Sequence, residues 1–341
     1  MTNIVKQAVG IDVAQKELVV SMGSMNQEMT VEIFAFKTFS NNEKGFKALT
    51  QWVEKLSKKE GNLRYVMEAT GVYHEPLAYY LTGNDLEVSI VMPNKISNFF
   101  RTLDVNTITD KTASQTITRF GLERKLDIWQ KPKKIFRDLR QLTRERDQLI
   151  AERTFLKNQL HAEQAEVFPN EGSIGRMNKR IELINSQEVE IKAEIAGTLQ
   201  QDKQLVKQVE KIITIPGVGK LTAVIVLAET NGFELIRNKK QLVSYSGLDV
   251  REKQSGTSVK GKPRISKKGN RHLRKAMHLP ALSAIRNNER FKAIFVRLVS
   301  KHGIKMKAVV ALQRKLLELI YVVWKTNKSY DKDYLQLITL N

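Results

Sequence analysis

The chain has 341 residues, no cysteine and a formal net charge of +21. It is long enough for more than one hydrophobic core, because single domains usually have roughly 100–200 residues, and without cysteine it can have neither disulfides, nor cysteine-ligated zinc, nor a cysteine nucleophile. It shows no signal peptide and no run of about 18 apolar residues, so we expect a soluble, cytoplasmic protein.

The first 130 residues alternate between strand-like and helix-like patterns. The predicted order is three strands, a helix, a strand, a helix and a strand, at 7–12, 17–22, 29–39, 46–56, 63–67, 75–82 and 88–91, followed by helices after Pro93 and after Asp110. Such an order predicts a mixed α/β domain.

Residues 135–195 have an apolar residue at every third or fourth position, which is typical of a coiled coil. Arg146, Arg153 and Glu188 take positions in the apolar seam, and Phe168-Pro-Asn-Glu-Gly172 interrupts the pattern. Two long helices joined by a turn are therefore predicted. They either pack only on each other or use the buried charges to specify a partner helix in an oligomer.

The remaining segment is predicted to be mostly helical and strongly basic. Helices are expected at 221–229, 238–245 and 305–325, with a Gly/Ser/Lys-rich stretch at 251–270. Residues 1–130 have 15 Lys and Arg and 15 Asp and Glu, whereas residues 131–341 have 42 and 21, and residues 236–275 have 13 basic residues against Asp249 and Glu252. A nucleic acid is the natural partner of such a charge density; a lysine-rich solubility surface is the alternative.

Three carboxylates follow predicted strands or begin a predicted helix. Asp12 and Glu68 lie at strand ends, and Asp110 lies at the head of a helix. Hard oxygen ligands from several elements are what a magnesium site for phosphoryl transfer needs. A surface position or a helix cap is the alternative for Asp110.

A glycine-rich turn, Ile215-Pro-Gly-Val-Gly219, precedes the helix at 221–229. It resembles the hairpin of helix-hairpin-helix modules, in which backbone N–H groups approach a DNA phosphate. Gly217, Gly219 and Lys220 are therefore candidate DNA contacts, with an ordinary turn as the alternative. The turn is not a P-loop, because Thr214 and Leu221 stand where that motif needs Gly and Ser or Thr.

The stretch from Gln254 to Arg274 combines serines with cations. A serine surrounded by positive charge is suited to attack a phosphodiester, and composition alone does not choose among Ser255, Ser258 and Ser266. The alternative is a phosphate-binding loop whose serines bond only the backbone. The candidate phosphate contacts here are Lys260, Lys262, Arg264, Lys267, Lys268, Arg271 and Arg274.

Several motifs together resemble the DEDD transposases of bacterial insertion sequences, the IS-one-ten (IS110) group. The match runs in order over nearly the whole chain. The motifs are Gly10-Ile-Asp12-Val, Met67-Glu68-Ala-Thr-Gly-Val-Tyr73, Thr109-Asp110-Lys-Thr, Ile215-Pro-Gly-Val-Gly219, Ser246-Gly-Leu248, Gln254-Ser-Gly256 and Ile265-Ser-Lys-Lys-Gly-Asn270.

This resemblance implies an RNase H-like (RuvC-like) N-terminal domain over 1–130 and a coiled-coil connector over 131–208. It implies a mostly α-helical transposase domain over 209–341, with a helix-hairpin-helix-like element. It further implies a DNA recombinase that is guided by a non-coding RNA, binds target and donor DNA, and works near the nucleoid as a tetramer built from dimers. By the same resemblance, Mg²⁺ is bound by Asp12, Glu68 and Asp110, and Ser255 becomes covalently joined to DNA.

One position departs from the family pattern. The family has its last two acids as Asp-x-x-Asp, but here Asp110 is followed at the fourth position by Ala113, and Asp104 lies at the wrong spacing. Either three acids suffice or the chain carries a substitution that stalls catalysis; we favour the second. The alternatives to a recombinase are a RuvC-like metal-dependent junction nuclease and a non-catalytic nucleic-acid-binding protein.

Overall fold

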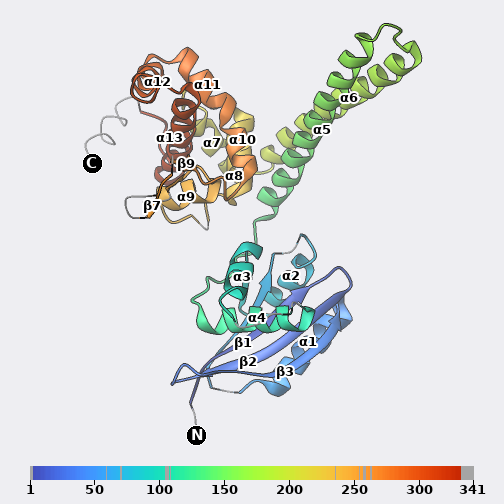
Figure 1. Ribbon diagram of the computed structural model, residues 1–341, viewed down its shortest axis with the longest axis vertical. Coiled ribbons are helices and arrows are strands. Elements are labelled where there is room, and N and C mark those ends of the chain that lie inside the picture. The colour runs from blue at the N-terminus through green and yellow to red at the C-terminus, as the bar shows by residue number, and fades with distance from the viewer. Residues whose placement is uncertain are drawn as a thin grey trace. The chain divides into compact units, whose positions relative to one another are not determined.

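The computed structural model describes residues 3–58, 60–69, 71–103, 107, 109–234, 236–252, 254–255, 259–261 and 263–331, with 254–255 and 259–260 described by their backbone alone. The chain divides into two compact units, one ending at Lys131 and one beginning at Pro132 (Figure 1). Within these described ranges, no helix combines the length and the apolar character that would let it span a membrane.

The first unit is a mixed sheet with helices on both faces. Its strands are β1 (Ile4–Val13), β2 (Glu17–Asn26), β3 (Val31–Ser40), β4 (Asn62–Glu68) and β5 (Val88–Val91). Its helices are α1 (Glu43–Leu56), α2 (Glu75–Gly83), α3 (Pro93–Phe100) and α4 (Asp110–Glu123). The predicted order of elements is confirmed, although β2 extends four residues beyond its predicted end.

The five strands have the spatial order β3-β2-β1-β4-β5. β1, β2 and β3 form an antiparallel meander, whereas β1, β4 and β5 are parallel. Alternate residues of β1 pack on opposite faces: Val9 and Ile11 share a core with α1 and α2, and Ala8 and Gly10 lie against α4. The arrangement is consistent with the RuvC-like, RNase H-type domain expected from the resemblance.

The second unit is almost entirely helical. Its helices are α5 (Lys134–Gln164), α6 (Glu171–Gln200), α7 (Lys203–Ile212), α8 (Lys220–Thr230), α9 (Lys239–Ser246), α10 (Arg271–Ala276), α11 (His278–Asn287), α12 (Glu289–His302) and α13 (Lys305–Thr326). The domain boundary predicted at 208 falls inside α7, and Phe136 and Leu139 at the start of α5 belong to the same core as the later helices. The division into connector and C-terminal domain stays a prediction.

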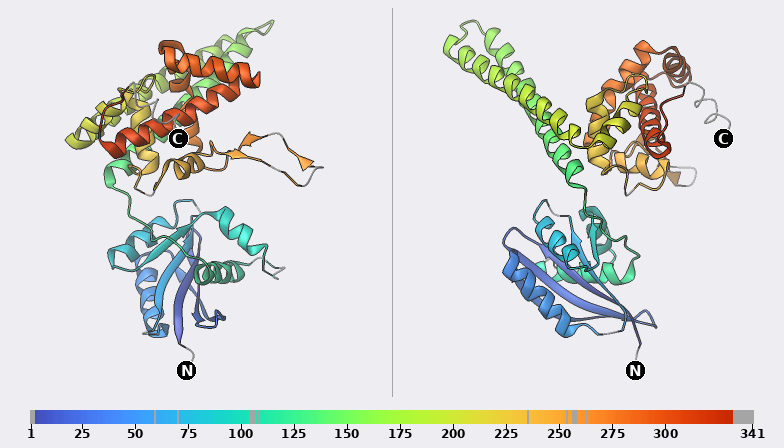
Figure 2. Two further views of the ribbon diagram at one scale, coloured as in Figure 1. Left: turned by 90° about the vertical axis from the view of Figure 1, so that its left-hand side faces the viewer. Right: turned by 180° about the vertical axis from the view of Figure 1, so that it is seen from behind.

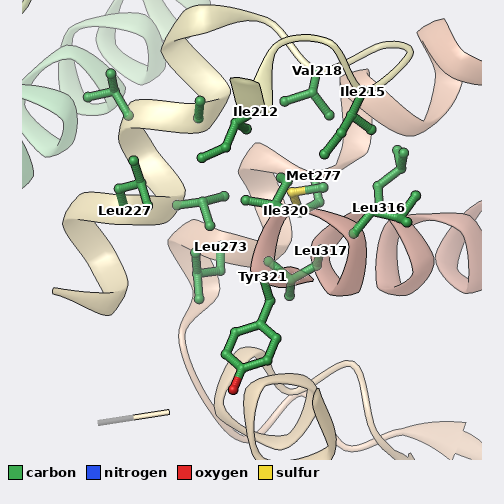
Figure 3. Packing of buried hydrophobic residues seen from close by; sticks show 14 of the residues in the cluster. Ile212, Ile215, Val218, Leu227, Leu273, Met277, Leu316, Leu317, Ile320 and Tyr321 are labelled. Atoms are coloured by element: carbon green, nitrogen blue, oxygen red, sulfur yellow. The ribbon is translucent and has the colours of Figure 1, made fainter. Parts of the chain in front are cut away.

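α13 lies at the centre of this core. Leu312, Leu316, Leu317 and Ile320 have no exposed surface, as expected of a helix that is apolar on most of its circumference. Figure 3 shows Leu316, Leu317 and Ile320 among side chains of α7, α8 and α10. The basic segment extends from this core.

α5 and α6 form an antiparallel pair with charged residues in an otherwise apolar seam. The Glu188 carboxylate, whose side chain is 7% exposed, accepts from Arg146 at 2.8 Å and from Arg153 at 2.5 Å, and Lys192 lies 2.8 Å away. These contacts, led by Lys192, lower the pKa of Glu188 to about 2. The seam charges therefore pair within the chain.

Candidate functional site

Asp12 lies one residue before the end of β1, and Glu68 is the last residue of the neighbouring parallel strand β4. The register of β1 and β4 pairs Gly10 with Val66 and Ile11 with Met67, so Asp12 and Glu68 are the next residues along the two strands. Alternation puts both on the sheet face that carries Gly10 and Val66, which is the face covered by α4. Sequence reasoning placed both acids correctly at strand ends.

α4 brings Asp110 to the same edge of the sheet. Gly10 allows the close approach: its N–H donates to Thr118 Oγ1 at 3.1 Å, and the Ser21 and Ser114 hydroxyls are 2.7 Å apart. Asp110 lies on the helix face of Ser114 and Thr118, because residues four apart share a face. The helix begins at Asp110, and Thr109 accepts from the N–H of Thr112 as the N-cap.

Asp12 is affected by the negative charge of Asp110. Burial raises the pKa of Asp12, the negative charge of Asp110 raises it further, and a backbone hydrogen bond from Val13 lowers it. Asp12 is half-buried and Asp110 is exposed. Carboxylates that repel each other next to solvent have the donor chemistry of a divalent-cation site, because a cation between them removes the repulsion.

The described residues do not form a complete three-ligand metal cluster. Among the residues that the structure describes, no three acidic or histidine side chains are grouped so that they could hold a metal ion. The assignment of Asp12, Glu68 and Asp110 as ligands stays a prediction. Ala113 lies one turn after Asp110 and one turn before Ile117, which packs with Val66 of β4. An acid at position 113 would therefore lie on the side of α4 that faces the strand of Glu68.

Asn41 joins loops at this edge, and sequence reasoning missed it. Its side-chain amide donates to the carbonyls of Ala14 and Tyr73 at 2.8 and 3.1 Å. Its own N–H donates to the carbonyl of Lys16 at 2.8 Å. Asn41 thus connects the turn after Asp12 with the loop after Glu68. The only sequence signal was an Asn after a strand, which is common in turns.

Replacing Gly10 with alanine is expected to destabilise the first unit by about 1–3 kcal/mol, the usual cost of overpacking. A Cβ on Gly10 would lie 2.2 Å from the backbone nitrogen of Thr118, so α4 would have to move away from β1. Urea unfolding of the full chain would measure the loss. Gly83→Ala is the control, since a Cβ there meets nothing within 4 Å; equal stability of the two variants would contradict the close packing.

In the second unit, the Gly/Ser/Lys-rich stretch forms a β-hairpin. The paired strands are β6 (Val250–Arg251) with β9 (Arg264–Ile265) and β7 (Gln254–Ser255) with β8 (Val259–Lys260). In Figure 2 (left) the hairpin extends away from the helices of its own unit. A loop was expected here, because strands of two residues with few apolar side chains leave no alternating pattern.

The structure describes two of the three candidate serines. The backbone of Ser255 lies on β7, opposite Val259, and Ser258 lies outside the described residues. The Ser266 hydroxyl donates to Asp249 Oδ1 at 2.5 Å, and its N–H donates to the carbonyl of Asp249 at 2.8 Å. Ser266 therefore holds the base of the hairpin together.

The predicted phosphate contacts divide into exposed and engaged side chains. Arg264, Lys267, Lys268 and Arg271 are exposed. Arg274 instead donates to the carbonyl of Ser246 at 2.7 Å. Lys262 is outside the described residues, and only the backbone of Lys260 is described.

The hairpin base is attached to the helical core through Glu229. This carboxylate is 3% exposed, receives two hydrogen bonds from Arg144 at 2.7 and 2.8 Å, and accepts from Asn270 Nδ2 at 2.6 Å. The Tyr245 hydroxyl donates to the Glu229 carbonyl at 3.0 Å. Sequence reasoning missed this network, which joins residues 85 and 41 positions apart.

The predicted helix-hairpin-helix element consists of α7, a turn and α8. Gly217 has φ +82°, and a Cβ there would lie 2.4 Å from the carbonyl oxygen of Pro280 in α11. Packing therefore explains this glycine. Gly219, the N-cap of α8, and Lys220 are exposed, so their role as DNA contacts stays a prediction.

Comparisons with known proteins place the chain among DNA transposases. A family model described as "Transposase" matches residues 9–169, and a second, described as "Transposase IS116/IS110/IS902 family", matches residues 209–295. The chain belongs to the IS110 family of transposases, and the predicted family is confirmed.

Two similar proteins are the pilin gene-inverting proteins of Moraxella bovis and Moraxella lacunata. Each is 29% identical to the chain over 301 residues, which is 86% of this chain and 90% of the relative. A 43.6 kDa insertion element IS110 protein of Streptomyces coelicolor is 26% identical over 120 residues, 35% of this chain and 29% of that protein. The structure of Thermus thermophilus RuvC in complex with a Holliday junction substrate is similar over 36% of this chain and 99% of that chain, with 6% identity and a TM-score of 0.28.

Proposed function

We propose that the protein is an RNA-guided DNA recombinase that cuts and joins strands through Ser255. The observation that carries the proposal is the position of Ser255 on a basic hairpin that extends from the helical core, while Ser266 is engaged with Asp249. Family membership supports DNA as the substrate. Target and donor DNA are the expected substrates.

The proposed reaction at Ser255 is a transesterification. The serine oxygen forms a bond to phosphorus, one P–O bond of the DNA strand breaks, and the serine proton ends on the oxygen that leaves. One phosphodiester replaces another, so a second DNA end can reverse the reaction and become joined. Exposed cations near the hairpin base, such as Lys267 and Lys268, would stabilise the charge that develops on phosphate.

The carboxylates of the first unit are assigned to Mg²⁺. Asp12, whose pKa is raised by the charge of Asp110, would supply oxygen donors together with Asp110, and Glu68 ends the strand next to that of Asp12. When bound, the cation would neutralise phosphate charge and polarise a phosphoryl oxygen. Ser21, Ser114 and Thr118 hold α4 on the sheet and so set the position of Asp110.

Guide RNA and a second copy of the chain are the proposed partners. Exposed cations along α5 and α6 suit contacts to nucleic-acid backbones, while base pairing supplies sequence specificity. These cations are Lys157, Arg176, Lys179 and Arg180. The same helix pair exposes Phe155, Phe168, Leu183 and Val189. Assembly into dimers and a tetramer, which we propose, could bury these side chains.

Restoring the family acid tests the carboxylate assignment. Ala113→Asp is expected to raise recombination in a plasmid assay at least about tenfold, because adding a missing ligand strengthens divalent-cation binding. The new variant should also reach half-maximal activity at lower Mg²⁺ concentration. Gln115→Asp is the matched control, since position 115 is on α4 but not on the face of Asp110.

Three results separate the alternatives. Equal activity of the Ala113→Asp variant and the parent chain would contradict the role of position 113. Mg²⁺-dependent cleavage without any covalent adduct would favour the junction nuclease. A chain that binds DNA but neither cuts nor joins it after Asp is restored would favour the non-catalytic binding protein.

A further inference from the structure

Two arginines face each other across the base of the hairpin. The β6–β9 register pairs Arg251 directly with Arg264. Directly opposite residues of an antiparallel pair have Cβ atoms about 4.5–5.5 Å apart on one face, and like charges there destabilise the sheet. This pairing therefore acts against the hairpin unless an anion lies between the two guanidinium groups.

The described part of the chain provides no such anion. Both arginines are exposed, and no described residue forms a hydrogen bond or ion pair with either side chain. Of the two nearby acids, Asp249 is bonded to Ser266 at 2.5 Å, and Glu252 forms no ion pair with either arginine among the described residues. The charge of Arg251 and Arg264 is thus available to a ligand.

Phosphate is the anion that fits this pair. Each guanidinium presents several N–H donors in a planar fork that matches phosphate oxygens. A two-stranded ribbon is also narrow enough to enter the major groove of DNA. Arg251 precedes Ser255 by four residues, which span at most about 14 Å of chain. A phosphate held by the two arginines would therefore belong to a nucleotide only a few positions along the strand from the one at Ser255.

We propose that Arg251 and Arg264 together hold one phosphate group of the DNA strand that reacts with Ser255. The inference rests on the proposed function, because the reacting strand is the one that passes Ser255. Arg251 was not among the residues expected from the sequence; only the strand register identifies it as the partner of Arg264.

The test is equilibrium binding of the full chain to a labelled DNA duplex at several salt concentrations. Arg251→Gln and Arg264→Gln are each expected to weaken binding about tenfold and to reduce the slope of log affinity against log salt by about 0.9, the value for one phosphate. Because both arginines hold the same phosphate, the salt slope of the double variant should also fall by about 0.9, and not by about 1.8. Lys328→Gln, an exposed cation elsewhere in the unit, is the control.

A charge reversal distinguishes a ligand contact from a structural role. Arg264→Glu would place opposite charges across the strands, which favours the hairpin, yet it should weaken DNA binding more than Arg264→Gln does. Unchanged thermal unfolding together with this larger loss of binding supports the proposal that the two arginines hold a phosphate. Binding of Arg264→Glu that equals that of the parent chain would overturn it.

Two further outcomes would also overturn the inference. One is an unchanged affinity and salt slope in both Gln variants. The other is a loss that appears with a structured RNA but not with the DNA duplex, which would assign the phosphate to RNA. None of these measurements depends on cleavage. A failure of the proposed phosphate contact is therefore distinguishable from a failure of Ser255 as nucleophile, which is judged by the covalent adduct alone.

Discussion

Replacing Ser255 with alanine is expected to abolish the covalent protein–DNA adduct, with at least about a 10³-fold fall in recombination, as when a nucleophile is removed from other enzymes. The Ala113→Asp chain is the parent for this experiment. End-labelled DNA that migrates with the protein on a denaturing gel measures the adduct. DNA binding should change little, because one hydroxyl is lost and no positive charge is removed.

Ser266→Ala is the matched control, since Ser266 lies in the same basic segment. It should cost about 1 kcal/mol of stability through the lost hydrogen bond to Asp249 and should retain the adduct. An adduct that persists in the Ser255 variant and disappears in the Ser266 variant would reverse the assignment. Cleavage that continues without an adduct in both would leave water as the attacking group.

Replacing Glu229 with alanine is expected to destabilise the second unit by about 3 kcal/mol, near the lower end for breaking a buried ion pair. Arg144 is 43% exposed, so part of its charge is solvated and the cost lies below that of a fully buried pair. The change also leaves Asn270 without its carboxylate partner. Denaturant unfolding, monitored by circular dichroism, measures the loss of stability. Glu182→Ala, at an exposed position, is the control.

The same interaction predicts a pH dependence with a definite sign. Burial alone would raise the pKa of Glu229, but the hydrogen bonds from Arg144 and Asn270 and the charge of Arg144 outweigh burial and lower it. A lowered pKa means that the contribution is complete above the unfolded value of about 4.3 and is lost as the pH falls below it. Glu229→Gln should remove this acid sensitivity. Identical acid unfolding curves for the two proteins would contradict the assignment.

The sequence predicted local elements well because local signals determine them. Apolar residues at helical spacing determine α1 and α13, and turn residues bound the strands of the first unit. Asp12 and Glu68 were placed at strand ends by the same signals. The contact between α4 and β1 could not be predicted, because it depends on Gly10 meeting Thr118 across 108 positions.

In the basic segment, by contrast, the sequence did not predict the local structure. Its charge indicated a nucleic-acid contact, but its strands are too short for a periodic pattern, so the pairing of Arg251 with Arg264 was invisible. Gly217 is predicted to contact a phosphate, but its positive φ and the close approach of Pro280 already account for a glycine at this position. Composition can indicate a kind of partner, but the particular residues that bind it depend on register and long-range contacts.

The carboxylate of Glu188 also fixes the register between α5 and α6. Arg146 and Arg153 are two turns apart, and Glu188 bonds both. Sliding α6 by a single turn would move this carboxylate about 5.4 Å along the axis and break at least one of the bonds. With a pKa of about 2, Glu188 stays ionised at every pH of a living cell. The register between α5 and α6 therefore does not change with pH, and Phe168 in the turn that joins them stays at a fixed distance from the helical core.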